Sequence, residues 1–138
     1  MKHSRFVLKF TLFFSVIFAS AVITSCQSVP KDIPTDLTAR EIVQKAQNAS
    51  NNGNNKAAEV YYKTLLERYG MDTSIYIEAN FEIAHLCIKQ KRYEEATSRL
   101  NDILSIYESS APGELPAQFK KLASIDMAKI PDSYKTAE

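Results

Sequence analysis

Cysteine and histidine are scarce in this chain, and their scarcity limits the chemistry it can perform. Its 138 residues include 2 cysteines, 2 histidines and no tryptophan. A zinc site needs three or four ligands of these types, and a Cys–His nucleophile needs two adjacent side chains. His85 and Cys87 are two positions apart, so a helix would point them to different faces. The sequence therefore predicts neither a metal site nor a Cys–His couple, and Cys87 is expected to be a small buried hydrophobic residue.

Glycine is almost as scarce, which removes phosphate-binding loops. The 3 glycines stand at positions 53, 70 and 113, and none belongs to a glycine-rich loop. The pairs Glu94–Glu95 and Glu78–Glu82 fit solvated helix faces better than a general acid and base. We therefore expect a protein that is not an enzyme and that needs no cofactor.

The charge balance excludes another class of function. The first 25 residues contain Lys2, Arg5 and Lys9 and no acidic residue, so the other 113 carry 14 basic and 16 acidic residues. A nucleic-acid surface needs a concentrated basic patch. The sequence therefore predicts no nucleic-acid partner and no purely electrostatic attachment to a membrane.

The beginning of the chain has the pattern of an export signal. A basic start is followed by an apolar stretch over residues 6–23, which only Lys9 interrupts with a charge. The part after Lys9 is shorter than the roughly 20 apolar residues of a membrane-spanning helix. A basic start and a short apolar core are typical of a secretory signal peptide.

The stretch ends in Ile23-Thr24-Ser25-Cys26, which resembles the bacterial lipobox. The resemblance implies removal of residues 1–25, a diacylglycerol on the Cys26 sulfur and an acyl chain on its amine. Two or more acyl chains give stable anchoring to a membrane. The lipobox usually has leucine where Ile23 stands, and often Ala-Gly before the cysteine. The alternatives are a signal anchor over residues 6–24, or an ordinary cysteine after a plain signal.

The rest of the chain predicts a tether followed by helices. Residues 26–37 contain Pro30 and Pro34 and lack helical periodicity, so we expect a lipidated, flexible tether. Apolar residues at steps of three and four then predict helices over about 39–51, up to Gly70, over 75–90, through Tyr93–Tyr107 and over 116–130. Thr38 and Glu41 fit a capping box, and Gly70 fits a left-handed helix end. The predicted fold is all-α.

The first two helices resemble the next two at an offset of 38 residues. Small residues on one helix of each pair match small or aromatic residues on the other, which allows close antiparallel packing. The matched positions are Ala46 with Ala84, Ala49 with Cys87, Ala58 with Ala96, Tyr62 with Leu100, and Leu65 with Ile103.

This pattern resembles the tetratricopeptide repeat (TPR). That repeat has a small residue at its eighth position, alanine at its twentieth and an aromatic near its twenty-fourth, with a period of about 34 residues. The chain departs from it in the longer period, the absence of tryptophan and the alanine at the eighth position. The resemblance implies an α-solenoid of two TPR-like pairs over residues 38–110 and a capping helix with a frayed tail over 111–138. The alternative is a four- or five-helix bundle.

A narrower resemblance concerns residues 39–110. Leu65-Leu66-Glu67-Arg68-Tyr69-Gly70 and the later Lys91-Arg92-Tyr93-Glu94-Glu95-Ala96 resemble the repeat region of the BamD family. Those lipoproteins belong to the outer-membrane β-barrel assembly machinery and have proline where Gly70 stands. The resemblance implies barrel-assembly components as partners, although this chain has fewer repeats.

In tetratricopeptide repeats the first helix of each pair lines a concave groove. The resemblance therefore implies a partner-binding groove, and Phe81, His85 and Ile88 also lie on a face apart from the inward stripe of their helix. The alternative is that Phe81 and Ile88 pack against the first repeat or the last helix. The implied groove residues are Arg40, Val43, Gln47, Asn51, Glu78, Phe81, His85, Ile88 and Lys89.

These features predict a non-catalytic protein–protein adaptor, anchored by lipid in the bacterial cell envelope. We expect it in the outer membrane, facing the periplasm, with help to outer-membrane protein assembly as the most specific role. The rival hypotheses are a surface-exposed lipoprotein that binds host or extracellular ligands, and a small-ligand carrier, which would need an enclosed apolar cavity.

Overall fold

The computed structural model describes residues 28–135, and all its regular structure is helical. No strand occurs within these residues, which confirms the predicted all-α class. The signal, lipobox and Cys26 predictions fall on residues 1–27, outside the described residues. The helices are α2 (Ala39–Asn51), α3 (Asn55–Tyr69), α4 (Thr73–Lys89), α5 (Tyr93–Ser109), α6 (Ala117–Lys129) and the 3-10 helix η2 (Asp132–Tyr134).

The helix starts follow local side-chain chemistry. The Thr38 hydroxyl accepts from the backbone N–H of Glu41, and the Glu41 carboxylate accepts from the N–H of Thr38 at 2.8 Å. This reciprocal pair is the predicted capping box, and it satisfies two N–H groups that the first turn leaves free. Asp72 caps α4 by accepting from the N–H groups of Ser74 and Ile75. The cap makes α4 begin at Thr73, two residues before its predicted start.

Gly70 corrects one prediction. It ends α3 with φ −66°, in the right-handed region, and not in the expected left-handed one. A Cβ at this position would lie 2.4 Å from the carbonyl oxygen of Leu66. Close approach to the helix backbone, and not a positive φ, is therefore what favours glycine here.

The two helix hairpins repeat each other in detail at the predicted offset of 38 residues. Three backbone hydrogen bonds close the α2–α3 turn, and their counterparts close the α4–α5 turn. Gly53 and Lys91 occupy the same left-handed position in these turns, with φ 74° and 61°. The bonds join Asn52 N–H to Asn48 O, Gly53 to Ser50 and Asn54 to Ala49, then Gln90 to Leu86, Lys91 to Ile88 and Arg92 to Cys87.

The matched side chains are buried in both hairpins, except Ala49, which is half-buried and packs against the core. Ala46 and Ala84, like Ala58 and Ala96, are fully buried, as are Leu65, Ile103 and Cys87. Small side chains at these crossings let the paired helices approach closely, so that larger residues such as Tyr62 fill the space on either side. The internal repeat is thus a repeat of packing as well as of sequence, and Cys87 is the predicted small buried residue.

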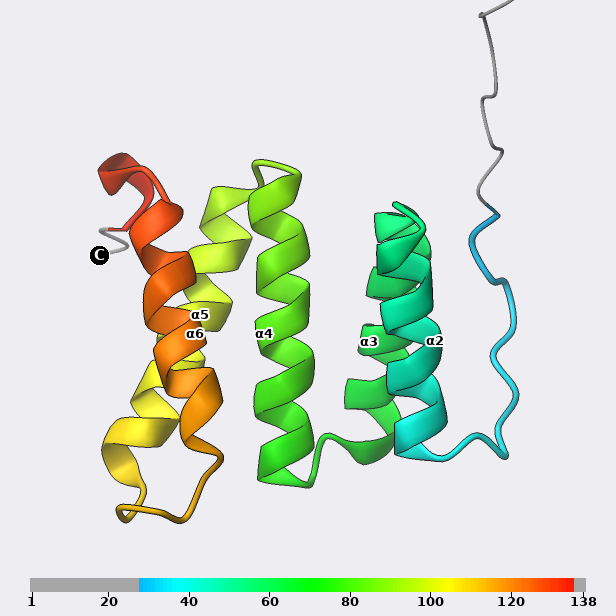
Figure 1. The fold of residues 1–138 in the computed structure, drawn as a ribbon, viewed down its shortest axis with the longest axis horizontal. Helices are drawn as coiled ribbons and strands as arrows, with labels where there is room; N and C mark the ends of the chain where they lie inside the picture. The colour runs from blue at the N-terminus through cyan, green and yellow to red at the C-terminus, as the bar shows by residue number, and fades with distance from the viewer. Residues whose placement is uncertain (1–27, 136–138) are drawn as a thin grey trace, which may run out of the picture.

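The helices form two layers. In Figure 1, α2, α4 and α6 lie toward the viewer, and α3 and α5 lie behind them. Each described α-helix packs against the next α-helix along the chain, and α6 packs against both α4 and α5. Helix α6, the predicted capping helix, therefore covers the second hairpin. Beyond it, η2 packs on α5 through Tyr134 and Tyr93, whose ring centroids are 5.3 Å apart. The last residues, 136–138, for which fraying is predicted, lie outside the described residues.

Residues 28–37 are fastened to the first hairpin. The Arg68 guanidinium donates to the carbonyl oxygens of Ile33 and Pro34, and the Tyr69 hydroxyl donates to that of Leu37 at 2.7 Å. The Asn54 amide donates to the Ser28 carbonyl at 3.1 Å. We call this segment the strap. The flexible tether predicted here is thus corrected, because its backbone carbonyls bind helix side chains.

Candidate functional site

The predicted groove residues of the first hairpin remain accessible. Arg40, Gln47 and Asn51 are exposed, and Val43 is half-buried. Among the described helices, α2 packs against α3 alone. The exposed residues of α2 are therefore accessible to a partner.

Phe81, on α4, does not line an open groove. Its side chain is 6% exposed, and its ring centroid lies 5.7 Å from that of Phe119 on α6. The His85 ring also stacks with the Phe81 ring, with a centroid distance of 6.0 Å. The cap helix covers Phe81, as the packing alternative states. Its assignment to the partner surface is therefore wrong.

The other groove residues of α4 divide by polarity. Ile88 is half-buried and packs against the core. Glu78 and His85 are half-buried, and Lys89 is exposed. Only the polar members thus remain on an accessible face of α4.

These polar residues form one continuous row with Glu82. The positions of Glu78, Glu82, His85 and Lys89 follow steps of four, three and four, which place them on one face of a helix. We call this set the polar row. It runs along most of α4, and the Glu78–Glu82 end lies near Tyr62 on α3. Burial raises the pKa of Tyr62, and the negative charges of Glu82 and Glu78 raise it further.

The two glutamates of the polar row are partly removed from water without a cationic partner. Burial raises the pKa of both Glu78 and Glu82 above the ordinary value. His85 and Lys89 pull the pKa of Glu82 down, but burial outweighs them. Within residues 28–135 neither carboxylate forms an ion pair. They are therefore not the fully solvated face that the sequence predicted.

Replacing Glu82 with glutamine is expected to stabilise the fold at neutral pH. The folded chain holds the Glu82 proton more tightly than the unfolded chain, so stability falls as pH rises from about 4.5 through the raised pKa. Glutamine removes this cost because it carries no charge. Urea unfolding between pH 4 and 8 should show a higher free energy of unfolding for the variant. The difference from the native chain should be largest near and above pH 7 and should disappear toward pH 4. The exposed Glu94→Gln serves as control, and an equal gain at every pH would contradict the assignment.

A buried carboxylate on α6 joins the row to the cap helix. Asp126 is 2% exposed, and its Oδ2 lies 2.6 Å from Nδ1 of His85. Its Oδ1 accepts from the Lys129 ammonium, also at 2.6 Å. Two partners thus compensate the buried charge, and the contact with His85 ties α6 to α4.

The spacing of buried residues in the last helix indicates that Asp126 faces inward, although it was not among the predicted site residues. Phe119, Ala123 and Ile130 are the buried apolar residues of the last helix and the residue after it. Position 126 continues their spacing of four, three and four, so it lies on the inward face. An ionisable residue at an inward position predicts a buried partner, and His85 is that partner.

The chemistry of the site favours recognition of charged groups. Within the described chain, no group of three or more His, Cys, Asp or Glu side chains is placed to hold a metal ion. His85 Nδ1 is engaged by Asp126, and the side chain is 33% exposed. The unpaired carboxylates, this imidazole and the Lys89 ammonium offer charges and hydrogen bonds to a macromolecular partner.

A second charged network is structural. The Arg92 guanidinium joins Glu59 of α3 to Glu95 of α5, and the Arg99 guanidinium joins Glu95 to the Asn80 amide oxygen. Burial alone would raise the pKa of Glu59, but hydrogen bonds from Lys63 and Arg92 hold it below the ordinary value. This network links the two hairpins.

Cys87 lies beside the network, and burial raises the pKa of its thiol to about 11. At neutral pH the thiol is protonated and enclosed, so it is a poor nucleophile.

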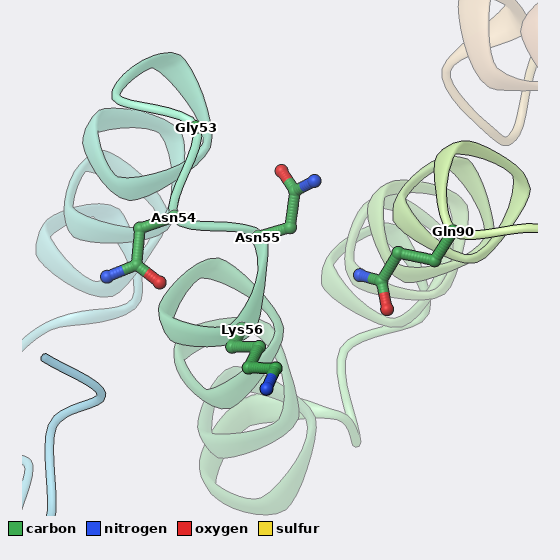
Figure 2. A pocket seen from close by; sticks show the side chains of 5 residues that line it. All are labelled: Gly53, Asn54, Asn55, Lys56 and Gln90. Atoms are coloured by element: carbon green, nitrogen blue, oxygen red, sulfur yellow. The ribbon is translucent and has the colours of Figure 1, made fainter. Parts of the chain in front are cut away.

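An open hollow lies at one end of the molecule, away from the polar row's glutamates. Its volume is about 350 Å³, and Figure 2 shows its lining, formed by Gly53, Asn54, Asn55, Lys56 and Gln90. These groups come from the α2–α3 turn and from the residue that ends α4. The lining is polar and open to solvent, unlike the enclosed apolar cavity that a small-ligand carrier needs.

Comparisons with known proteins give one relative to report. A protein of Treponema pallidum (strain Nichols), described as uncharacterized, is 36% identical over 108 residues, which cover 77% of this chain and 43% of that protein. This chain therefore spans less than half the length of the relative. Neither a family model nor a solved structure matches the chain. Among the described helices, none is long and apolar enough to cross a membrane.

Proposed function

We propose that the protein is a non-catalytic, lipid-anchored adaptor of the bacterial cell envelope that binds a protein partner. One observation carries the proposal: Glu78 and Glu82, in the polar row of α4, are half-buried, and within residues 28–135 neither forms an ion pair. Desolvated carboxylates left unpaired are costly, and a cationic side chain from a partner would remove the cost. The partner surface is therefore expected to present lysine or arginine.

The predicted lipid anchor suits the role of an envelope adaptor. A lipid on Cys26 would hold the domain at a membrane, and the outer membrane facing the periplasm is the proposed site. The helical hairpins, with their 38-residue repeat, supply the rigid scaffold that such recognition needs. By the resemblance to the BamD family, assistance to β-barrel assembly is the most specific form of the proposal.

The partner should be lost when the two carboxylates are neutralised. We expect the Glu78→Gln/Glu82→Gln variant to recover at least tenfold less partner than the native chain, since unpairing a buried charge costs about 2 kcal/mol or more. The measurement is cross-linked co-purification of the full-length protein from native membranes, read by mass spectrometry. The control is Glu67→Gln/Glu94→Gln, which removes the same charge from exposed positions.

The identity of the recovered proteins separates the alternatives. Barrel-assembly components recovered with the native chain and the control, but not with the test variant, would support both the role and the site. Recovery of host or extracellular proteins, together with protease accessibility on intact cells, would favour the surface-exposed lipoprotein. Equal recovery with both variants would overturn the assignment of the site.

A further inference from the structure

The strap determines where the beginning of the domain emerges. Its first fastening is at Asn54, before the first turn of α3, and its last is at Tyr69, in the final turn. The strap therefore runs alongside the first hairpin from the α2–α3 turn to the opposite end, as its blue trace shows in Figure 1. Ser28 lies at the end of the molecule that carries the two hairpin turns.

The placement of Ser28 limits where a lipid anchor would join the domain. Cys26 precedes Ser28 by two residues, and two extended residues span at most about 7 Å. A lipid on Cys26 would therefore join the described part of the chain near the α2–α3 turn.

The same end exposes basic side chains. Lys56, Lys89 and Lys91 are exposed, and within residues 28–135 none forms an ion pair. Glu94 is also exposed there, and Asp132 is paired with the half-buried Lys135, so the unpaired charge is mainly positive. We call this surface, with Asn54 and Gln90 of the hollow, the lysine end. The opposite end exposes charges of both signs, which are Glu67, Asp72, Glu108 and Glu114 together with Arg40, Lys120 and Lys121.

The backbone of Lys91 adds an independent observation. Lys91 has φ 61°, a left-handed conformation that costs free energy for any residue with a Cβ. The equivalent position in the first hairpin is Gly53, for which that conformation is free of strain. A glycine at position 91 would relax the turn, so the lysine is retained at a cost. Such strain often marks a position with a functional role.

We propose that the lysine end lies against an anionic phospholipid surface, with the strap fixing the domain in that orientation. The inference rests on the proposed lipid anchor at Cys26 and adds to it the direction in which the domain stands. Lysines within a Debye length of anionic headgroups are attracted to them. The polar row would then run away from the membrane, with Glu78 about 16 Å farther out than Lys89 at 1.5 Å per residue.

The orientation can be measured with single tryptophans because the chain has none of its own. Gln90→Trp places the reporter at the lysine end, and Met71→Trp places it on the fully exposed turn at the opposite end. Each full-length variant, purified with its lipid, is inserted into phosphatidylcholine–phosphatidylglycerol vesicles that contain a headgroup nitroxide quencher. We expect strong quenching of Gln90→Trp and little of Met71→Trp.

Two further variants test the parts of the proposal. Lys91→Gly, on the Gln90→Trp background, should raise the unfolding temperature. It should also lower the equilibrium constant for contact between the domain and the vesicle surface about fivefold. Replacing phosphatidylglycerol with phosphatidylcholine should have a similar effect. Asn54→Ser/Arg68→Met removes strap hydrogen bonds while serine keeps an oxygen to cap α3, and it should reduce the difference between the two reporters.

The outcomes separate this inference from the function on which it rests. If mass spectrometry finds no lipid on Cys26, both the proposed anchor and the orientation fail. If the lipid is present and both tryptophans are quenched equally, or Met71→Trp more strongly, the orientation alone is overturned. If the quenching of Gln90→Trp changes neither with lipid charge nor with Lys91→Gly, the electrostatic contact is refuted.

Discussion

Replacing Phe81 with alanine is expected to lower the free energy of unfolding by about 3 kcal/mol or more. The side chain fills the space between α4 and α6 and contacts Phe119 and His85. Its removal leaves a cavity between the cap helix and α4. Urea denaturation of the full-length protein measures the change in free energy. The thermal unfolding temperature should fall by on the order of 15 °C.

The control for this prediction lies on the cap helix itself. Ile125 is 44% exposed, so Ile125→Ala should change stability little. A double-mutant cycle with Phe119→Ala should show a coupling of about 1 kcal/mol, as expected for an aromatic pair. A Phe81→Ala protein as stable as the native chain would mean that α6 does not cover Phe81. The same burial makes Phe81→Glu unsuitable as a probe of the partner surface, because it would unfold the cap before testing any partner.

Replacing Cys26 with serine is expected to abolish lipid attachment completely. Serine lacks the thiol that would form the thioether bond to diacylglycerol. Incorporation of labelled palmitate should fall to background, and the chain should keep its first 25 residues because their removal is expected to require the lipidated cysteine. Growth with labelled palmitate followed by intact-protein mass spectrometry gives both readings.

The matched control changes the neighbouring residue and keeps the cysteine. Ser25→Ala retains a small side chain before Cys26, so labelling and processing should equal those of the native chain. Labelling that persists in Cys26→Ser would place the lipid elsewhere. A native chain that begins at another residue and carries no lipid would favour plain secretion.

Much of the fold could be predicted because local signals agreed with one another. The capping residues Thr38 and Glu41, the apolar steps of three and four, and the turn residues around Gly53 all indicated helices with the observed order. The repeat was visible because the close crossings of two helices accept only small side chains, as at Ala58 and Ala96. These are short-range constraints, and a single sequence contains them.

The candidate site could be predicted only in part. The register of α4 gave Glu78, His85 and Lys89 a common face, but it did not show which neighbouring face the cap would cover. Phe81 and His85 are one helical turn apart, and only the position of α6 makes one buried and the other accessible. The sequence predicted Glu82 on a solvated face. Its partial burial depends on the neighbouring helices, which the spacing of charges along the sequence does not reveal.

The charge distribution shows the same division. The net charge of about −2 beyond residue 25 argued against electrostatic contact with a membrane. The fold brings Lys56, from the first hairpin, to the same end as Lys89 and Lys91, from the second. A sum over the sequence contains no information about such clustering, and it is the clustering that motivates the proposed contact.

The sequence by itself determined the helical class, the helix boundaries to within a few residues and the 38-residue repeat, because periodicity and capping act over one or two turns. The tertiary structure decided that α6 covers Phe81, that Asp126 is buried against His85 and that the strap is bound along the first hairpin. Each of these depends on contacts between residues more than 30 positions apart. Such contacts form only when helices pack, and a single sequence states no preference among the alternatives.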